Sequence, residues 1–169
     1  MTVPPLTPDE LVAAGGEREV LEAFLDLYRD IVVRKVAGLS AEVAGRRLVA
    51  SPTTLAGIVQ HLASVEREWF GSVLEQRPPA EAGVRVADDG WGVDPSHGVD
   101  ALVADYRRAC AESRRVAGGF RLDDTVPHTR LGRVSLRWIY VHMIEETARH
   151  AGHADILREQ TDGATGFDG

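Results

Sequence analysis

Two residues able to bind a metal ion are spaced one helical turn apart in the C-terminal part of the chain. Glu146 and His150 lie within the stretch HMIEETARHAGHADILRE, residues 142–159, which otherwise has the composition of a helix. At about 100° per residue, these side chains and two further histidines, His142 and His153, fall within an arc of roughly 80°. One helix face therefore carries four groups suited to cation binding or proton transfer.

A third candidate ligand, His61, interrupts an apolar stripe beside Leu62 in another segment. A buried imidazole needs a partner, because leaving it unpaired costs on the order of 1–3 kcal/mol. Bringing His61 to Glu146 and His150 supplies that partner. Three protein ligands leave a coordination position for water or substrate, as in catalytic sites. Two nitrogens and one carboxylate oxygen suit zinc, with iron, nickel or manganese as alternatives.

Simpler roles are open for each of these residues. A lone histidine on an apolar stripe is more often a hydrogen-bonded core residue than a ligand. Glu146 and His150 could form only a surface ion pair. His142 and His153 are expected to support the ligands or to pack on the helix, and in a catalytic site they are the candidate proton carriers.

Other reactive side chains are interpreted as structural. Glu66, interpreted as lying just off the helix face of His61, is predicted to accept a hydrogen bond from an imidazole. Cys110 lies on the apolar face of a predicted helix, which favours a packed, unreactive thiol. His97 and His128 lie in predicted connections without ligand spacing around them and are interpreted as ordinary loop residues.

Composition bounds the class of protein. With 169 residues, 44% of them apolar, the chain can bury one sizeable core. We expect one domain over residues 1–169, with 1–16 and 164–169 loosely ordered. A net charge of -7, with 19 basic residues among 26 acidic ones, argues against a nucleic-acid partner.

Location can be predicted from the same features. One cysteine cannot form an internal disulfide, and the N-terminus lacks the basic and apolar regions of a signal peptide. No apolar run approaches the roughly 20 residues of a membrane span. We therefore expect a cytoplasmic protein without a membrane partner.

Four helical segments must position the candidate ligands. Apolar residues recur at helical spacing over 17–37, 52–74, 99–117 and 135–160. Ser51 is predicted to cap the second segment, with Pro52 at its first helical position. Residues 76–98 are rich in Gly and Pro and are interpreted as a long connection. With no credible sheet, the pattern predicts an all-α four-helix bundle, whose core can hold a site built from facing helices.

Three stretches make the chain recognisable. They are GEREVLEAFLDLYRDIVVRKVAGLS, TTLAGIVQHLASVEREWF and SLRWIYVHMIEETARHAGHADILREQTDGATG. Together they closely resemble the DinB-like superfamily, in particular its actinobacterial branch related to thiol-dependent enzymes. The resemblance covers nearly the whole chain.

The resemblance implies a DinB-like four-helix bundle that holds a divalent metal through His61, Glu146 and His150. Many members have histidine at both positions of the last helix; Glu146 here resembles the pattern of mycothiol-dependent maleylpyruvate isomerase. Characterised relatives use a low-molecular-weight thiol, mycothiol or bacillithiol, and often form homodimers. Arg137 and the 76–98 connection are the candidates for contacting a carboxylated thiol or closing the site.

These features predict a metal-dependent thiol S-transferase acting on small electrophiles, in which the metal lowers the pKa of the thiol. Two alternatives are left open. The same ligands would suit a hydrolase or isomerase that activates water. A stress or ligand-binding protein without enzymatic activity would instead have a structural or vestigial metal and a dimer surface as its functional part. A fourth ligand, such as His142 or His153, that closes the coordination would support it.

Overall fold

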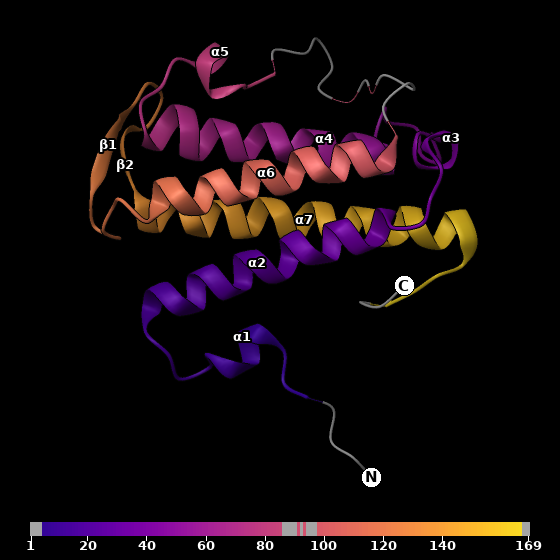
Figure 1. Cartoon of the computed structure of the whole chain (residues 1–169), viewed down its shortest axis with the longest axis horizontal. Coiled ribbons are helices and arrows are strands. Elements are labelled where there is room, and N and C mark those ends of the chain that lie inside the picture. The colour runs from indigo at the N-terminus through magenta and orange to yellow at the C-terminus, as the bar shows by residue number, and fades with distance from the viewer. Residues whose placement is uncertain (1–4, 86–90, 92, 94–97, 167–169) are drawn as a thin grey trace.

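Four long helices lie side by side along the longest dimension of the molecule (Figure 1). The computed structural model describes residues 5–85, 91, 93 and 98–166. Within them the long helices are α2 (Glu17–Val36), α4 (Leu55–Glu66), α6 (Val99–Ala117) and α7 (Leu136–Asp162). The prediction of an all-α four-helix bundle is therefore confirmed.

Shorter elements join these helices. They are α1 (Pro8–Leu11), α3 (Ala41–Ala44), η1 (Arg67–Leu74), α5 (Pro79–Ala82), β1 (Thr125–His128) and β2 (Gly132–Ser135). The π-helix η1 continues directly from α4, and α5 lies within the predicted 76–98 connection. Of the rest of that connection, residues 86–90, 92 and 94–97, including His97, lie outside the described residues.

The directions of the helices decide which side chains can meet. In Figure 1, α2 and α7 run one way while α4 and α6 run the other way. The closest packing is of α2 against α7 and of α4 against α6, and α4 also contacts α7. Because α4 and α7 are antiparallel, residues late in α4 lie beside residues early in α7.

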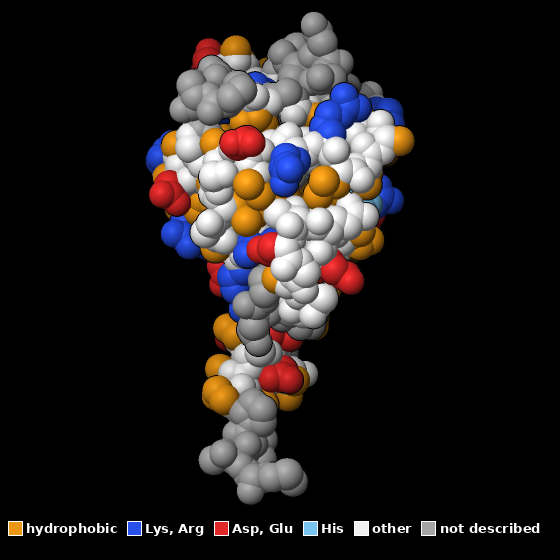
Figure 2. Space-filling model, turned by 90° about the vertical axis from the view of Figure 1, so that its right-hand side faces the viewer, with side chains coloured by type: hydrophobic (Ala, Val, Ile, Leu, Met, Phe, Trp, Pro, Cys, Tyr) orange, Lys and Arg blue, Asp and Glu red, His pale blue; other side chains and the backbone are white. Residues whose placement is uncertain are grey.

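The end of the bundle carries a mixed surface. Viewed from the right-hand side of Figure 1, acidic, basic and hydrophobic side chains are interspersed, and the segment with α1 projects from the bundle (Figure 2). No residue of α1 is buried, and Leu11 is largely exposed. Among the described residues, no helix is both long enough and apolar enough to cross a membrane.

The prediction that the chain forms no sheet is wrong in one place, between α6 and α7. There β1 and β2 form an antiparallel hairpin with Val126 paired to Val134, and both valines are buried. Gly132 adopts φ 74°, which lets a three-residue loop close the hairpin. Four-residue strands containing Pro127 give too short an alternation to stand out in the sequence.

The predicted cap of α4 is also wrong. Thr54, rather than Ser51, caps the helix: its Oγ1 accepts a hydrogen bond from the Gly57 N–H at 2.9 Å. Ser51 instead hydrogen-bonds to Thr53 through its hydroxyl, and Pro52 precedes the helix. The helix that carries His61 therefore begins at Leu55, with its first turn fixed by a buried threonine.

A buried ion pair crosses the core between α2 and the end of α4. The guanidinium of Arg29 donates to both carboxylate oxygens of Glu66, at 2.8 and 2.6 Å, and both side chains are buried. Burial alone would lower the pKa of Arg29, but Glu66 raises it well above its ordinary value. The prediction that Glu66 supports an imidazole is therefore wrong, because its carboxylate is held by an arginine.

Glu66→Gln should lower the free energy of unfolding by about 3 kcal/mol, because the buried Arg29 charge then keeps only its pair with the partly exposed Asp26. Glu68→Gln is the matched control: Glu68 is exposed and has no ion pair among the described residues. It should change stability by less than about 0.5 kcal/mol. Urea denaturation at pH 7 measures both, and equal effects would contradict a stabilising role for the pair.

Candidate metal centre

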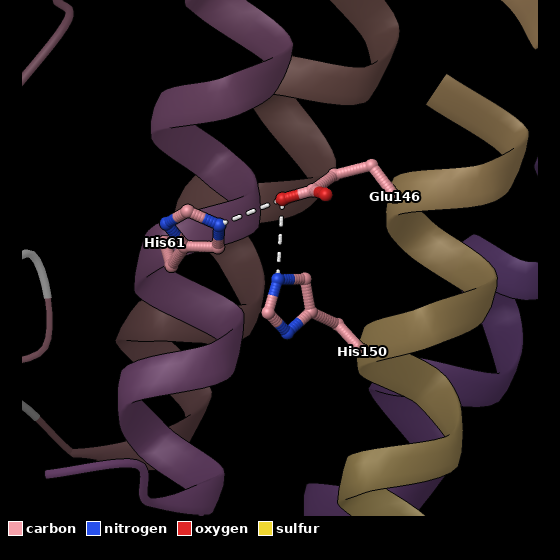
Figure 3. Close-up of side chains that lie close together, drawn as sticks. All are labelled: His61, Glu146 and His150. Atoms are coloured by element: carbon pink, nitrogen blue, oxygen red, sulfur yellow. Dashed lines mark hydrogen bonds and ion pairs between the residues drawn. The ribbon is translucent and has the colours of Figure 1, made fainter. Parts of the chain in front are cut away.

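The antiparallel pair α4 and α7 brings the three candidate ligands together. Figure 3 shows the carboxylate of Glu146 between two imidazole rings, one from each helix. Its Oε1 lies 3.1 Å from Nε2 of His61 and 3.2 Å from Nε2 of His150. One donor atom from each residue lies within 4.8 Å of the others, and no second such group occurs among the described residues.

Local helix structure explains this convergence. Ser135 caps α7, with its Oγ accepting from the Trp138 N–H, and α7 is continuous through the site. Glu146 and His150 are therefore stacked one turn apart on a single face. His150 is buried, whereas His61 keeps 26% of its side chain exposed. The site is thus anchored in the bundle and reachable from one side.

The electrostatics favour an ionised carboxylate. Hydrogen bonds from His150, and next from His61, hold the pKa of Glu146 well below its ordinary value, although partial burial acts in the opposite direction. An ionised carboxylate and two imidazole rings are donor types that bind divalent metal ions. Hydrogen bonding does not fully satisfy the cluster, because Nδ1 of His150 is buried without a partner among the described residues.

The donor set fits a small divalent cation. Ligands about 2.1 Å from a zinc ion lie roughly 3.4 Å apart in a tetrahedral site. The two contacts to Glu146, 3.1 and 3.2 Å, are close to that spacing, and all three donor atoms lie within 4.8 Å of one another. Only three donors converge in the described part of the chain, so a bound ion would keep a position for another ligand.

Trp91 covers the two ligand histidines from the side of the long connection. Its ring is stacked on His61, with centroids 4.9 Å apart, and tilted against His150 at 5.5 Å. A Cβ at Gly57 would lie 3.1 Å from the Trp91 carbonyl oxygen and 3.2 Å from its ring. The missing side chain at Gly57 therefore lets the indole pack closely over the site.

The two predicted proton carriers lie on opposite sides of the ligand pair along α7. His153 is exposed and its ring is 5.4 Å from that of His150, edge to face. His142 instead packs among tryptophans, 4.5 Å from Trp69 and 5.1 Å from Trp138. Neither belongs to the convergent donor group. Their catalytic roles stay predictions.

Arg137 is not brought to the ligands. It lies nine residues before Glu146, about 13 Å along the helix. Its guanidinium pairs with Glu17 at 2.6 Å and also with Asp123. Its predicted contact with a thiol stays untested.

Of two further residues interpreted as structural, Cys110 lies as predicted and His128 does not. Cys110 is buried as predicted, and burial raises the pKa of its thiol to about 12, which keeps it unreactive. His128 is not an ordinary loop residue, because it ends β1 and its ring is stacked on Trp69 at 5.5 Å. The sequence does not predict the contact of Trp91 with the ligands or the stacking of His128 on Trp69. Neither Trp91 nor His128 belongs to a segment with helical periodicity.

Gly57→Ala should destabilise the protein by about 1–3 kcal/mol, because the added methyl group crowds Trp91 and the capping oxygen of Thr54. Near-UV circular dichroism should show altered tryptophan packing, and urea denaturation should give the energy. Gly152→Ala on α7 is the control, since no heavy atom lies within 4 Å of its Cβ position. It should stabilise the helix by about 0.5–1 kcal/mol. Indistinguishable stabilities for the two variants would argue against close packing at Gly57.

Comparison with known proteins gives one clear relationship. Residues 20–163 match the family described as mycothiol-S-transferase. A search of curated proteins returned no match for the chain. The matched segment contains α4, α6 and α7, all of α2 except its first three residues, and the three residues of the candidate metal centre. The chain belongs to the mycothiol S-transferase family.

Proposed function

We propose that this protein is a divalent-metal-dependent S-transferase that joins mycothiol to small electrophiles. The observation that carries the proposal is the convergence of His61, Glu146 and His150 with no fourth donor among the described residues, in a chain of this family. Three ligands hold an ion while leaving it accessible to a thiol. Zinc is the proposed metal, with nickel, iron or manganese as alternatives.

A bound divalent ion would lower the pKa of the thiol and so favour the thiolate, which is the nucleophile. The protein supplies the surroundings for this chemistry. Glu146 stays ionised at neutral pH, and Trp91 shields the two histidines on one side. We propose that His153 passes the thiol proton to solvent; its ring is exposed and lies 5.4 Å from that of His150, which supports this role.

The transfer itself is a substitution at carbon or an addition to an activated double bond. The sulfur lone pair forms the new S–C bond. In a substitution the leaving group departs with the electrons of the bond that breaks. In an addition the π bond breaks, and its electron pair moves to the neighbouring atom, which takes up a proton. The thiol proton passes to the proposed proton carrier, His153, and then to solvent. No oxidation state changes, so the reaction needs no oxidant or reductant.

An apolar hollow beside the centre is suited to the electrophile. It has a volume of about 240 Å³ and is lined by Val49, Ser51, Thr53, His153, Ile156 and Leu157. Val49 and Ile156 are both exposed. We propose that the hydrophobic part of a small electrophile binds there, next to the ring that contacts His150.

The alternatives make different demands on the same site. A hydrolase or isomerase would turn over substrate without a thiol. A protein with a structural metal would need a fourth donor, but His142 packs on tryptophans and His153 lies outside the donor group. The arrangement therefore favours an open site over a closed one. Cytoplasmic location and a homodimer stay predictions.

Metal analysis tests the centre. Protein purified without a metal-binding tag and reconstituted with zinc should hold about one equivalent, and His61→Ala or Glu146→Gln should each lower the affinity at least tenfold. Glu145→Gln is the matched control, because Glu145 is exposed on α7 and pairs only with Arg149 among the described residues. It should retain the metal.

Activity assays test the reaction. Zinc-loaded protein should conjugate mycothiol to an electrophile such as a bimane probe, and Glu146→Gln should lose that activity together with the metal. Turnover without any thiol would support the hydrolase or isomerase. Metal retained by both ligand variants would overturn the proposed centre.

A further inference from the structure

Four aromatic rings form a continuous cluster beside the metal centre, which we call the aromatic row. They come from η1, β1 and α7: Trp69, His128, Trp138 and His142. The Trp69 ring is stacked on His128 at 5.5 Å, and the Trp138 ring is stacked on His142 at 5.1 Å. Trp69 also contacts Trp138 at 5.3 Å and His142 at 4.5 Å. The hairpin and two helices thus build one surface.

The aromatic row begins where the metal centre ends. On α7, His142 lies one turn before Glu146, and Trp138 lies eight residues before it, about 12 Å along the helix. On the facing helix, Trp69 lies eight residues after His61. Because α4 and α7 are antiparallel, both tryptophans lie on the same side of the centre, which is why their rings meet.

The aromatic row keeps exposed surface and free polar atoms. Trp138 is 42% exposed, although indoles are mostly buried in folded proteins. The ring of His142 is only partly buried, and its nitrogens make no hydrogen bond to the described residues. The surface therefore combines exposed indole surface with an imidazole that makes no hydrogen bond to the described residues.

We propose that the aromatic row binds the sugar-like part of the thiol cosubstrate, in a subsite contiguous with the metal centre. The inference rests on the proposed function and adds the residues that would recognise mycothiol. Mycothiol is a cysteine derivative linked through an amide to a glucosamine–inositol unit. Its rings have C–H groups on their faces and hydroxyls at their edges, which suit indole faces and imidazole nitrogens respectively.

The dimensions agree with this placement. The sulfur is separated from the glucosamine ring by about 6 Å of extended chain. That length matches the single turn from Glu146 to His142, whereas the second ring would reach the level of Trp138. A thiol held at the metal by its sulfur would therefore lay its sugar unit along the aromatic row.

A second copy of this chain fits the aromatic row less well than a small ligand does. A stable interface requires about 800 Å² from each partner, with a fully buried apolar centre. Beside Trp138 on α7 the exposed large hydrophobic residue is Val141, and Glu145 and Arg149 follow it as an exposed ion pair. One indole and one valine bordered by charges suit a small polar ligand better.

The first experiment measures binding of glucosaminyl-inositol, the sulfur-free part of mycothiol, by isothermal titration calorimetry on the zinc-loaded protein. The fragment should bind the wild type, and Trp138→Ala should weaken binding at least tenfold, with Trp138→Phe intermediate. Leu11→Ala is the control, since it removes exposed apolar surface on α1, away from the aromatic row; it should bind within twofold of wild type. Circular dichroism checks that each variant is folded.

The second measurement separates this inference from the proposed function. The ratio of kcat/KM for mycothiol to that for N-acetylcysteine, which lacks the sugar unit, should fall at least tenfold in Trp138→Ala. Fragment binding that depends on Trp138 in a protein without transferase activity would uphold the subsite and overturn the function. Transfer from mycothiol with no fragment binding, or with binding unchanged in Trp138→Ala, would overturn the subsite alone. A change of oligomeric state in both Trp138→Ala and Val141→Ala would identify a self-association surface instead.

Discussion

One carboxylate oxygen shared by two imidazoles is the constraint on which the site depends. Oε1 of Glu146 must lie close to His150 on its own helix and to His61 on the facing one, at 3.2 and 3.1 Å. The first contact follows from the i,i+4 spacing alone. The second fixes the height of α4 against α7, so the bundle must pack in one register for the ligands to converge.

The same register of α4 against α7 also determines which aromatic residues meet beside the metal centre. Once His61 faces Glu146, the antiparallel helices also bring Trp69 to Trp138, and the hairpin supplies His128 to the same cluster. Away from the site, the Arg29–Glu66 pair ties α2 to the end of α4. A buried charge pair contributes less to stability than to geometry, because its attraction must offset desolvation. The metal centre, the aromatic surface and the buried pair thus share one helix arrangement.

The three candidate ligands can be predicted from the sequence, whereas most of the residues that surround them cannot. Helical periodicity places Glu146 and His150 on one face, and the polar break at His61 indicates its partner. The same angular argument would have placed Glu66 about 140° from His61, facing another helix, as the structure has it. Trp91 lies in an aperiodic stretch, so its contact with His61 depends on tertiary packing. The pairing of Trp69 with Trp138 likewise requires the direction of two helices distant in sequence.

X-ray absorption at the zinc edge, recorded with and without mycothiol, tests the central claim most directly. An open three-ligand centre predicts two imidazole nitrogens and one carboxylate oxygen from the protein, completed by light atoms from solvent. Adding mycothiol should introduce one sulfur at about 2.3 Å. A spectrum that already requires four protein ligands, or one that shows no sulfur at saturating thiol, would contradict a metal centre built to activate the thiol.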